Sequence, residues 1–377
     1  MVVMHVRTMF VVLALVAGAC GSSSDDSLDE AAPVTNRQPP APVDATTTNE
    51  AESTTTESPN SEPATETTTT HPPISTTAAP PPRVFEPLRA DCSGLERVGV
   101  GLQTGEIESG GVQYKYQWTV PSTYDGSPLP VVLDFHAIGS NGAQQAQFAR
   151  WAALAETEGF LAVEPTGIPV APDERASWEL PQFDTDERDD VRMVRDLLDH
   201  VALNVCIDPT RIYSTGMSNG ALFTSVVVCE LADFIAAAVS VAGVTHDDSC
   251  NPARPVPYLA FHGTADTTIP FRGGGETTLD GAEGGGFFEQ IMPEEFGEFA
   301  DDFGCTESTD SVVSNSVTLT TYSGCESDVE MGFYTIDGGG HTWPGSPISA
   351  LIPSLGVTTT EVDATALAWE FFQRHSL

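Results

Sequence analysis

The chain of 377 residues contains 15 lysines and arginines against 54 aspartates and glutamates, which gives a formal net charge of −39. This excess of negative charge repels phosphate groups, so it argues against nucleic-acid binding and against adsorption to anionic membranes. The length accommodates one large domain or two ordinary ones.

The first 20 residues have the composition of an export signal. Arg7 supplies a positive charge, and the apolar stretch 9–16 is too short to span a membrane as a helix. The segment ends in Ala-Gly-Ala-Cys, and small residues before a cysteine are similar to a bacterial lipobox. We therefore predict a signal peptide over residues 1–20, a cell-surface or extracellular location and a lipid anchor at Cys20. The alternative is ordinary cleavage near Ala19.

Residues 21–82 consist mainly of Ser, Thr, Pro, Ala and Glu, with almost no aliphatic or aromatic side chains. Such a segment buries too little apolar surface to offset the entropy of ordering, so we predict a disordered tether. The remaining residues, 83–377, are enough for a single α/β domain with a sizeable core, and we predict a catalytic domain there.

The cysteines outside the predicted signal peptide form an even set, which in an exported chain indicates disulfides. Proximity in the sequence favours the pairs Cys229–Cys250 and Cys305–Cys325, which leaves Cys92–Cys206. The alternative is free buried thiols. A metal cluster is disfavoured because no Cys-x-x-Cys or histidine-rich spacing occurs, so we predict no metal site.

Strand-like and helix-like segments alternate along the domain. Alternating or continuous apolar runs predict strands at 112–120, 131–135, 161–163, 212–213, 235–241, 258–262 and 331–336, the first of them an antiparallel edge strand. Helical spacing predicts helices at 144–157, 189–201, 221–228 and 363–374, and residues 207–211 are predicted to form a turn. This alternation predicts a mainly parallel, doubly wound sheet with helices on both faces. Sites in such sheets collect at the carboxyl ends of the strands.

Residues 216–220, Gly-Met-Ser-Asn-Gly, lie between a predicted strand and an apolar predicted helix. Gly-x-Ser-x-Gly in that context is typical of a nucleophile elbow, in which a strained turn presents the serine hydroxyl. Ser218 is therefore the candidate nucleophile. The alternative is an ordinary glycine-rich turn between a strand and a helix.

An activated serine needs a base and an acid that orients the base. Asp266 follows the predicted strand 258–262, and His341 lies in a glycine-rich loop after the strand 331–336. The order Ser218, Asp266, His341 is that of the α/β hydrolases. Asp266 could instead cap a turn, and the histidines that compete for the role of base are His136, His262 and His246.

The roles define a reaction. His341 takes the proton from Ser218, the serine attacks an ester carbonyl, and water later hydrolyses the acyl-enzyme. The oxyanion needs two backbone donors: the amide of Asn219 and an amide of the turn after strand 131–135, at Ala137 or Ile138. The reaction requires no metal or organic cofactor.

Three sequence blocks carry a family resemblance: residues 216–220, residues 262–266 (His-Gly-Thr-Ala-Asp) and residues 338–345 (Gly-Gly-Gly-His-Thr-Trp-Pro-Gly). They resemble the secreted polyhydroxybutyrate depolymerase and feruloyl esterase group of α/β hydrolases. The match is spread over residues 98–372, and so covers nearly all of the predicted domain.

The resemblance implies an α/β-hydrolase fold and a triad of Ser218, Asp266 and His341. It also implies that the second oxyanion donor is the Ile138 amide, although Ala137 stands where the family has glycine. The implied substrates are short esters, hydroxyalkanoate polymers or oligomers, or feruloyl groups on plant polysaccharide, and the sequence does not choose among them.

Other interpretations stay open. A non-catalytic binding protein on a hydrolase scaffold would lack a triad member, and a serine peptidase would need side-chain pockets that the sequence does not reveal. Trp178 and Trp343 could line a substrate pocket, or could be packing residues. The glycine-rich stretch 273–288 could be a lid, although a plain surface insertion is favoured. The oligomeric state is not predicted.

Overall fold

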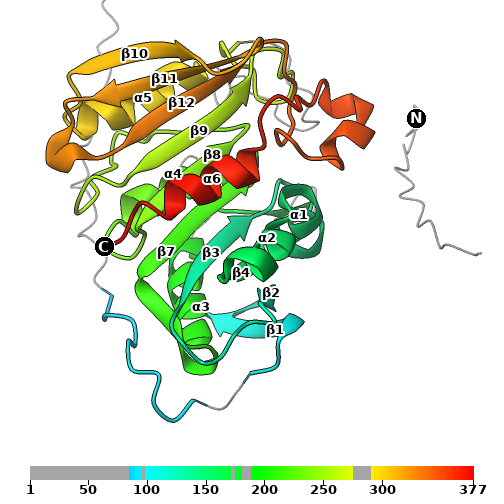
Figure 1. Ribbon diagram of the computed structural model, residues 1–377, viewed down its shortest axis with the longest axis vertical. Helices are drawn as coiled ribbons and strands as arrows, with labels where there is room; N and C mark the ends of the chain where they lie inside the picture. Colours follow the sequence, from blue (N-terminus) through cyan, green and yellow to red (C-terminus); the bar gives the residue numbers. More distant parts are fainter. Residues whose placement is uncertain (1–84, 96–97, 171–174, 181–187, 275–289) are drawn as a thin grey trace, which may run out of the picture. The chain divides into compact units, whose positions relative to one another are not determined.

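The computed structural model describes residues 85–95, 98–170, 175–180, 188–274 and 290–377 (Figure 1). All of these belong to one unit, Ser75–Leu377. The predicted signal peptide, the tether and Cys20 lie outside the described residues, as does most of the stretch 273–288. No helix in the described ranges is both long and apolar enough to cross a membrane.

A sheet of ten strands forms the centre of this unit. In spatial order its strands are β1 (Gly101–Ser109), β2 (Val112–Val120), β4 (Leu161–Thr166), β3 (Leu129–Phe135), β7 (Ile207–Met217), β8 (Ala237–Val241), β9 (Tyr258–Gly263), β12 (Met331–Ile336), β11 (Val317–Ser323) and β10 (Glu307–Val312). The strands from β4 to β12 in this order run parallel, and antiparallel strands extend the sheet at both ends. β5 (Ile168–Val170) and β6 (Arg175–Ser177) pair antiparallel in a separate two-stranded sheet.

Helices cover both faces of the sheet. On the side nearer the viewer in Figure 1 lie α1 (Gly142–Ala149), α2 (Trp151–Glu158) and α6 (Ala364–Phe372). The other helices within the described ranges are α3 (Asp190–Asn204), α4 (Asn219–Glu230) and α5 (Met292–Asp302), with short 3-10 turns η2 (Glu326–Asp328), η3 (Ser349–Leu351) and η4 (Pro353–Leu355). The predicted doubly wound α/β class is therefore confirmed.

The two hydrophobic cores follow from the period of two along each strand. On β3, Val132 packs in the core that contains Trp151 and Phe372, from α2 and α6. Its neighbours Val131 and Leu133 point to the opposite face and join the core that contains α3 and α4. Strands buried on both faces have continuous apolar sequences, which is why these segments were recognisable.

The prediction of an edge strand at 112–120 was right about the strand and wrong about the edge. β2 has these bounds, but β1 pairs with it along its whole length, from Gly101 opposite Val120 to Ser109 opposite Val112. The residues of β1 are largely polar, and its burial alternates between half-buried and exposed for most of its length. An edge strand that is buried on one face only has few apolar residues, so the sequence pattern did not predict β1.

The predicted helix 144–157 is interrupted. α1 and α2 are separated by Arg150, which has φ 60° and ψ 27° in the left-handed region. The Arg150 guanidinium donates to Asp363 Oδ2 at 2.5 Å. This long-range ion pair accompanies a break that helical spacing alone does not predict. The predicted turn at 207–211 also differs, because β7 already begins at Ile207.

The three disulfides pair as expected. Their Cα–Cα distances are 5.2 Å for Cys92–Cys206, 5.3 Å for Cys229–Cys250 and 3.7 Å for Cys305–Cys325. The first joins the segment before β1 to the residue before β7, and the second joins the end of α4 to the loop before β9. Cross-links of this kind are typical of proteins in oxidising, extracellular compartments.

Candidate active site

The elbow around Ser218 has the expected strained turn. Ser218 follows β7 directly, begins α4 as its N-cap, and has φ 57° and ψ −122°. A positive φ is unfavourable for a residue with a side chain, and is retained where the surroundings impose it. A Cβ on Gly216 would lie 2.8 Å from Phe135 O, and one on Gly220 would lie 2.7 Å from His136 O. The flanking glycines are therefore needed for β7 and α4 to pass close to the end of β3.

Asp266 and His341 meet at the ends of β9 and β12. His341 Nδ1 donates to Asp266 Oδ2 at 2.7 Å, and both residues are buried. The other carboxylate oxygen accepts the amides of Thr268 at 2.8 Å and Ile269 at 2.9 Å. Burial raises the pKa of Asp266, but the His341 imidazole and these hydrogen bonds outweigh it and hold the pKa below its ordinary value. The aspartate is thus ionised and fixes a proton on Nδ1, which leaves Nε2 of His341 as an acceptor.

Ser218 lies at the same edge of the sheet as this pair, because β7, β9 and β12 are parallel and all end there. The loop after Asp266 returns to the elbow. A Cβ on Gly243 would lie 3.0 Å from Ser218 O and 3.4 Å from Ile269 Cδ1, so both residues border this glycine. In the described part of the chain Ser218 Oγ makes no hydrogen bond to His341. Such pairs often tighten only when substrate binds.

The first rival base, His136, has a structural role. Its Nε2 accepts the Gly167 amide at 2.9 Å, so the proton lies on Nδ1 and is donated to Ala137 O at 2.7 Å. Burial lowers the pKa of His136 to about 4, which keeps the ring neutral near pH 7. His136 therefore braces the turn after β3 and has no free nitrogen for proton transfer.

His262 contacts Asp266. The sequence pattern did not predict this contact, and His262 was considered there only as an alternative base. Its Nε2 donates to Ile269 O at 2.9 Å and lies 3.4 Å from Asp266 Oδ2. The signal for this contact was its position four residues before Asp266, in the same strand-end turn. Burial lowers the pKa of His262, which favours a neutral ring beside the carboxylate.

His246, the last rival, contacts α5, where its Nε2 pairs with Asp302 Oδ2 at 2.8 Å. Together with Cys250 these residues form a group of potential metal ligands. Cys250 is, however, bonded to Cys229, so it offers no thiolate to a metal ion.

The two predicted oxyanion donors lie on neighbouring elements. Asn219 is the first residue of α4, where helix amides have no acceptor within the helix. Ile138 follows β3, whose last pairing places Phe135 opposite Gly216. Ala137 is not among the described residues with positive φ, so this turn does not require the glycine that the family has there.

Both tryptophans singled out in the sequence are buried, Trp178 at 2 % exposure and Trp343 at 1 %. Each indole N–H has an acceptor: His136 O at 2.9 Å for Trp178 and Thr365 Oγ1 at 2.9 Å for Trp343. This burial agrees with the packing alternative rather than with a pocket wall.

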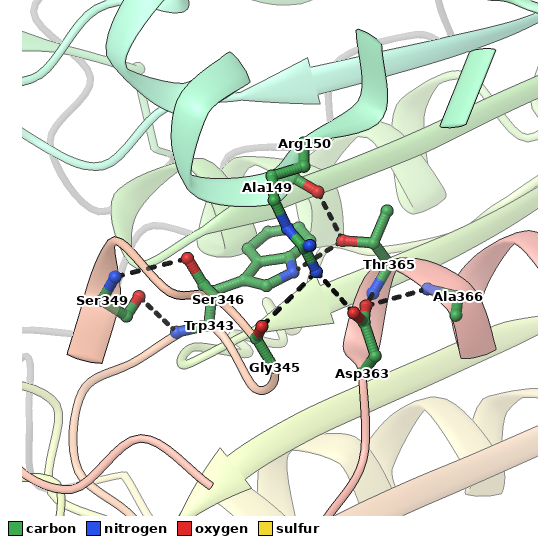
Figure 2. A network of polar contacts seen from close by, with 9 residues as sticks. All are labelled: Ala149, Arg150, Trp343, Gly345, Ser346, Ser349, Asp363, Thr365 and Ala366. Carbon is green, nitrogen blue, oxygen red and sulfur yellow. Dashed lines mark hydrogen bonds and ion pairs between the residues drawn. The ribbon is translucent and has the colours of Figure 1, made fainter. Parts of the chain in front are cut away.

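Figure 2 shows how the loop that contains His341 is attached to the helical layer. Thr365, in the first turn of α6, accepts from Trp343 and donates to Ala149 O at 2.5 Å. Arg150 pairs with Asp363, whose Oδ1 accepts the amide of Thr365 at 3.0 Å. The loop after β12 is therefore linked to the α1–α2 junction and to the start of α6.

Comparisons with known proteins agree with this picture. No family model matches the chain. The chain is 31 % identical over 230 residues to feruloyl esterase B of Piromyces equi, and the match covers 59 % of this chain and 41 % of the relative. It is 29 % identical over 115 residues to poly(3-hydroxyalkanoate) depolymerase C of Paucimonas lemoignei, covering 30 % of this chain and 28 % of the relative. The chain thus spans less than half the length of either relative.

Among solved structures, an acetyl xylan esterase from Aspergillus awamori superposes with a TM-score of 0.50 at 14 % identity, over 72 % of this chain and 99 % of that one. At this identity the likeness concerns the fold, and the fold is that of an α/β hydrolase. Within that class the chain is related to the group of feruloyl esterases and polyhydroxyalkanoate depolymerases that its motifs predicted.

Proposed function

We propose that the chain is a serine esterase that hydrolyses carboxylic esters through an acyl-enzyme. The main support is the 2.7 Å hydrogen bond between His341 Nδ1 and Asp266 Oδ2 at the sheet edge where Ser218 occupies a strained elbow. The named esterase relatives give the same class of reaction. The proposal follows from roles and geometry together, because the α/β-hydrolase fold alone hosts many functions.

The proposed mechanism uses only groups of the chain. His341 Nε2 removes the proton from Ser218 Oγ as the oxygen attacks the ester carbonyl, and the Asp266 carboxylate stabilises the imidazolium that forms. The amides of Asn219 and Ile138 donate to the oxyanion. His341 then protonates the departing alcohol, and a water molecule activated by the same nitrogen releases the acid.

The proposed substrates are feruloyl or acetyl esters of polysaccharide and hydroxyalkanoate esters, after the activities named for the relatives. The disulfides favour action outside the cytoplasm. The lipid anchor at Cys20 remains a prediction, since it concerns a residue outside the described ranges.

An ester panel tests the proposal. The wild-type chain is assayed against p-nitrophenyl acetate, p-nitrophenyl butyrate, methyl ferulate and hydroxybutyrate oligomers, with Ser218→Ala as the control. We expect hydrolysis of at least one ester and a loss of about 10³-fold or more in kcat/KM for Ser218→Ala. Full activity of Ser218→Ala would contradict the mechanism. No hydrolysis of any ester by the wild type would favour a binding protein.

A further inference from the structure

Trp178 contacts both halves of the proposed oxyanion hole. We propose that it is a positioning residue that sets the distance between the Asn219 amide on the elbow and the Ile138 amide on the turn after β3. We call Trp178, with its hydrogen bonds to Asn219 and His136, the Trp178 bridge. The inference rests on the proposed function and gives a role to a residue that otherwise only fills the core.

On the elbow side, the bridge consists of two hydrogen bonds to one side chain. The Trp178 amide donates to Asn219 Oδ1 at 2.7 Å, and Asn219 Nδ2 donates to Trp178 O at 3.3 Å. The side-chain amide of asparagine supplies both the donor and the acceptor that a peptide segment needs, whereas an aspartate carboxylate of the same length has no donor. This pairing explains why asparagine follows the nucleophile, since the oxyanion itself needs only the backbone amide of that residue.

On the turn side, the same segment holds the chain before and after Ile138. Trp178 Nε1 donates to His136 O at 2.9 Å, and Gly139 N donates to Ala176 O at 2.7 Å. His136 is itself fixed by the Gly167 amide. The peptide groups on either side of the proposed donor are therefore both anchored to β6 and the residues that follow it.

The indole ring makes the bridge rigid. It stacks on Phe223 of α4 at 5.3 Å between ring centroids and 13° between planes, and it meets Phe135 of β3 edge-on at 5.1 Å. The ring thus packs between α4, which carries the Asn219 amide, and β3, which leads into the turn that carries the Ile138 amide. Oxyanion donors act at 2.7–3.1 Å from the oxygen, so a small displacement of one of them weakens transition-state binding more than substrate binding.

The test replaces the indole by a ring without the donor. In Trp178→Phe we expect kcat/KM for p-nitrophenyl acetate to fall about 10-fold, mostly in kcat, with KM changed less than about 2-fold. The affinity for a trifluoromethyl ketone, whose serine adduct places an oxyanion in the hole, should fall by the same factor. The matched control is Trp369→Phe, a buried tryptophan of α6 that loses an indole hydrogen bond to Glu158 at the end of α2.

Asn219→Ala, which keeps the backbone amide, should reproduce the loss. The double variant should lose less than the product of the two single losses, because both changes break one bridge. This second variant keeps the test valid if Trp178→Phe does not fold.

Three results would overturn the bridge: kcat/KM of Trp178→Phe and Asn219→Ala equal to that of Trp369→Phe, unchanged ketone affinity alongside reduced kcat/KM, or multiplicative losses in the double variant. An inactive wild type, or an active Ser218→Ala, would instead overturn the proposed function.

Discussion

The two sides of Ser218 are built in different ways. On the side of the base, the groups that act are side chains, and the Asp266 carboxylate and the His341 imidazole contact each other directly. On the oxyanion side the proposed donors are backbone amides, and in our proposal their positions depend on buried residues such as Trp178, which is hydrogen-bonded to both segments. The first side is specified by residue identity at a few positions, and the second by the packing of whole segments.

This difference predicts how mutations act. A change on the side of the base should remove a chemical role and leave the fold intact. A change in the residues that support the proposed oxyanion donors should either lower stability and catalytic rate together, or lower the catalytic rate alone by displacing a donor. The following variants separate these outcomes.

The largest expected effect is that of Asp266→Asn on catalysis. An amide cannot hold the proton on His341 Nδ1 as the carboxylate does, so we expect kcat to fall about 10³- to 10⁴-fold with little change in melting temperature. The control is Asp337→Asn, an exposed aspartate just after β12 whose side chain accepts from Thr264. A loss of less than about 10-fold for Asp266→Asn would remove Asp266 from the proposed triad.

Gly220→Ala should affect both stability and catalysis. A Cβ there would press on the backbone at the end of β3, so we expect a loss of about 2–4 kcal/mol in the free energy of unfolding and an activity loss in the protein that remains folded. Gly297→Ala in α5 is the matched control, since its Cβ meets nothing within 4 Å. That control should be neutral or stabilise by up to about 1 kcal/mol. Denaturant unfolding of both variants measures the difference, and equal stabilities would contradict the close approach.

A smaller effect, on the pH dependence of stability, is expected from two buried carboxyl groups, Glu164 on β4 and Asp134 on β3. Burial raises the pKa of Glu164 on β4 to about 8, and burial together with the charge of Glu164 raises the pKa of Asp134 on β3. Their hydrogen-bond partners are amides, Gln117 for Glu164 at 3.4 Å and Gln145 for Asp134 at 2.9 Å.

The folded chain keeps its proton on Glu164 up to about pH 8, whereas the unfolded chain releases it near the ordinary value of 4.5. The folded state therefore binds more protons between these values, and the free energy of unfolding should fall as pH rises through them. Glu164→Gln, which cannot ionise, should flatten this decline and raise the melting temperature at pH 8 relative to wild type. Glu307→Gln, which removes an exposed carboxyl group on β10, is the control, and an unchanged pH profile for Glu164→Gln would refute the buried acid.

The smallest effect is expected for Trp343→Phe, which removes the hydrogen bond from the indole to Thr365 in the network of Figure 2. We expect a loss of about 1 kcal/mol beyond that of Trp151→Phe, and a reduction of kcat by a few fold. Trp151 is a suitable comparison because it is equally buried and its indole nitrogen has no hydrogen-bond partner among the described residues. Thermal unfolding of both variants decides between a network contact and simple packing.

The contrast between the two sides also explains what the sequence could predict. The elbow was predictable because its glycines and serine are constrained by a turn of five residues. Asp266 and His341 were predictable because each lies in the loop that follows an apolar strand. The core strands were predictable from continuous apolar runs such as that of β3. In each case the signal is local.

What the sequence did not predict depends on contacts between distant segments. β1 and β10 are polar edge strands that gain their place by pairing. The break at Arg150 accompanies an ion pair with a residue at the far end of the chain. The role of Trp178 depends on the position of its segment between the elbow and the turn after β3. The sequence does not show this position, and it does not distinguish a tryptophan that only packs in the core from one that positions other residues.

Covalent labelling of Ser218 is the most direct test of its role as the nucleophile. The full chain is treated with diethyl p-nitrophenyl phosphate, residual esterase activity is followed, and the modified peptide is sequenced by mass spectrometry. We expect one phosphoryl group per chain on Ser218, gained in step with the loss of activity, and no labelling of Ser218 in Asp266→Asn on the same timescale. Complete inactivation with the label on another residue, or full activity with Ser218 labelled, would contradict this role.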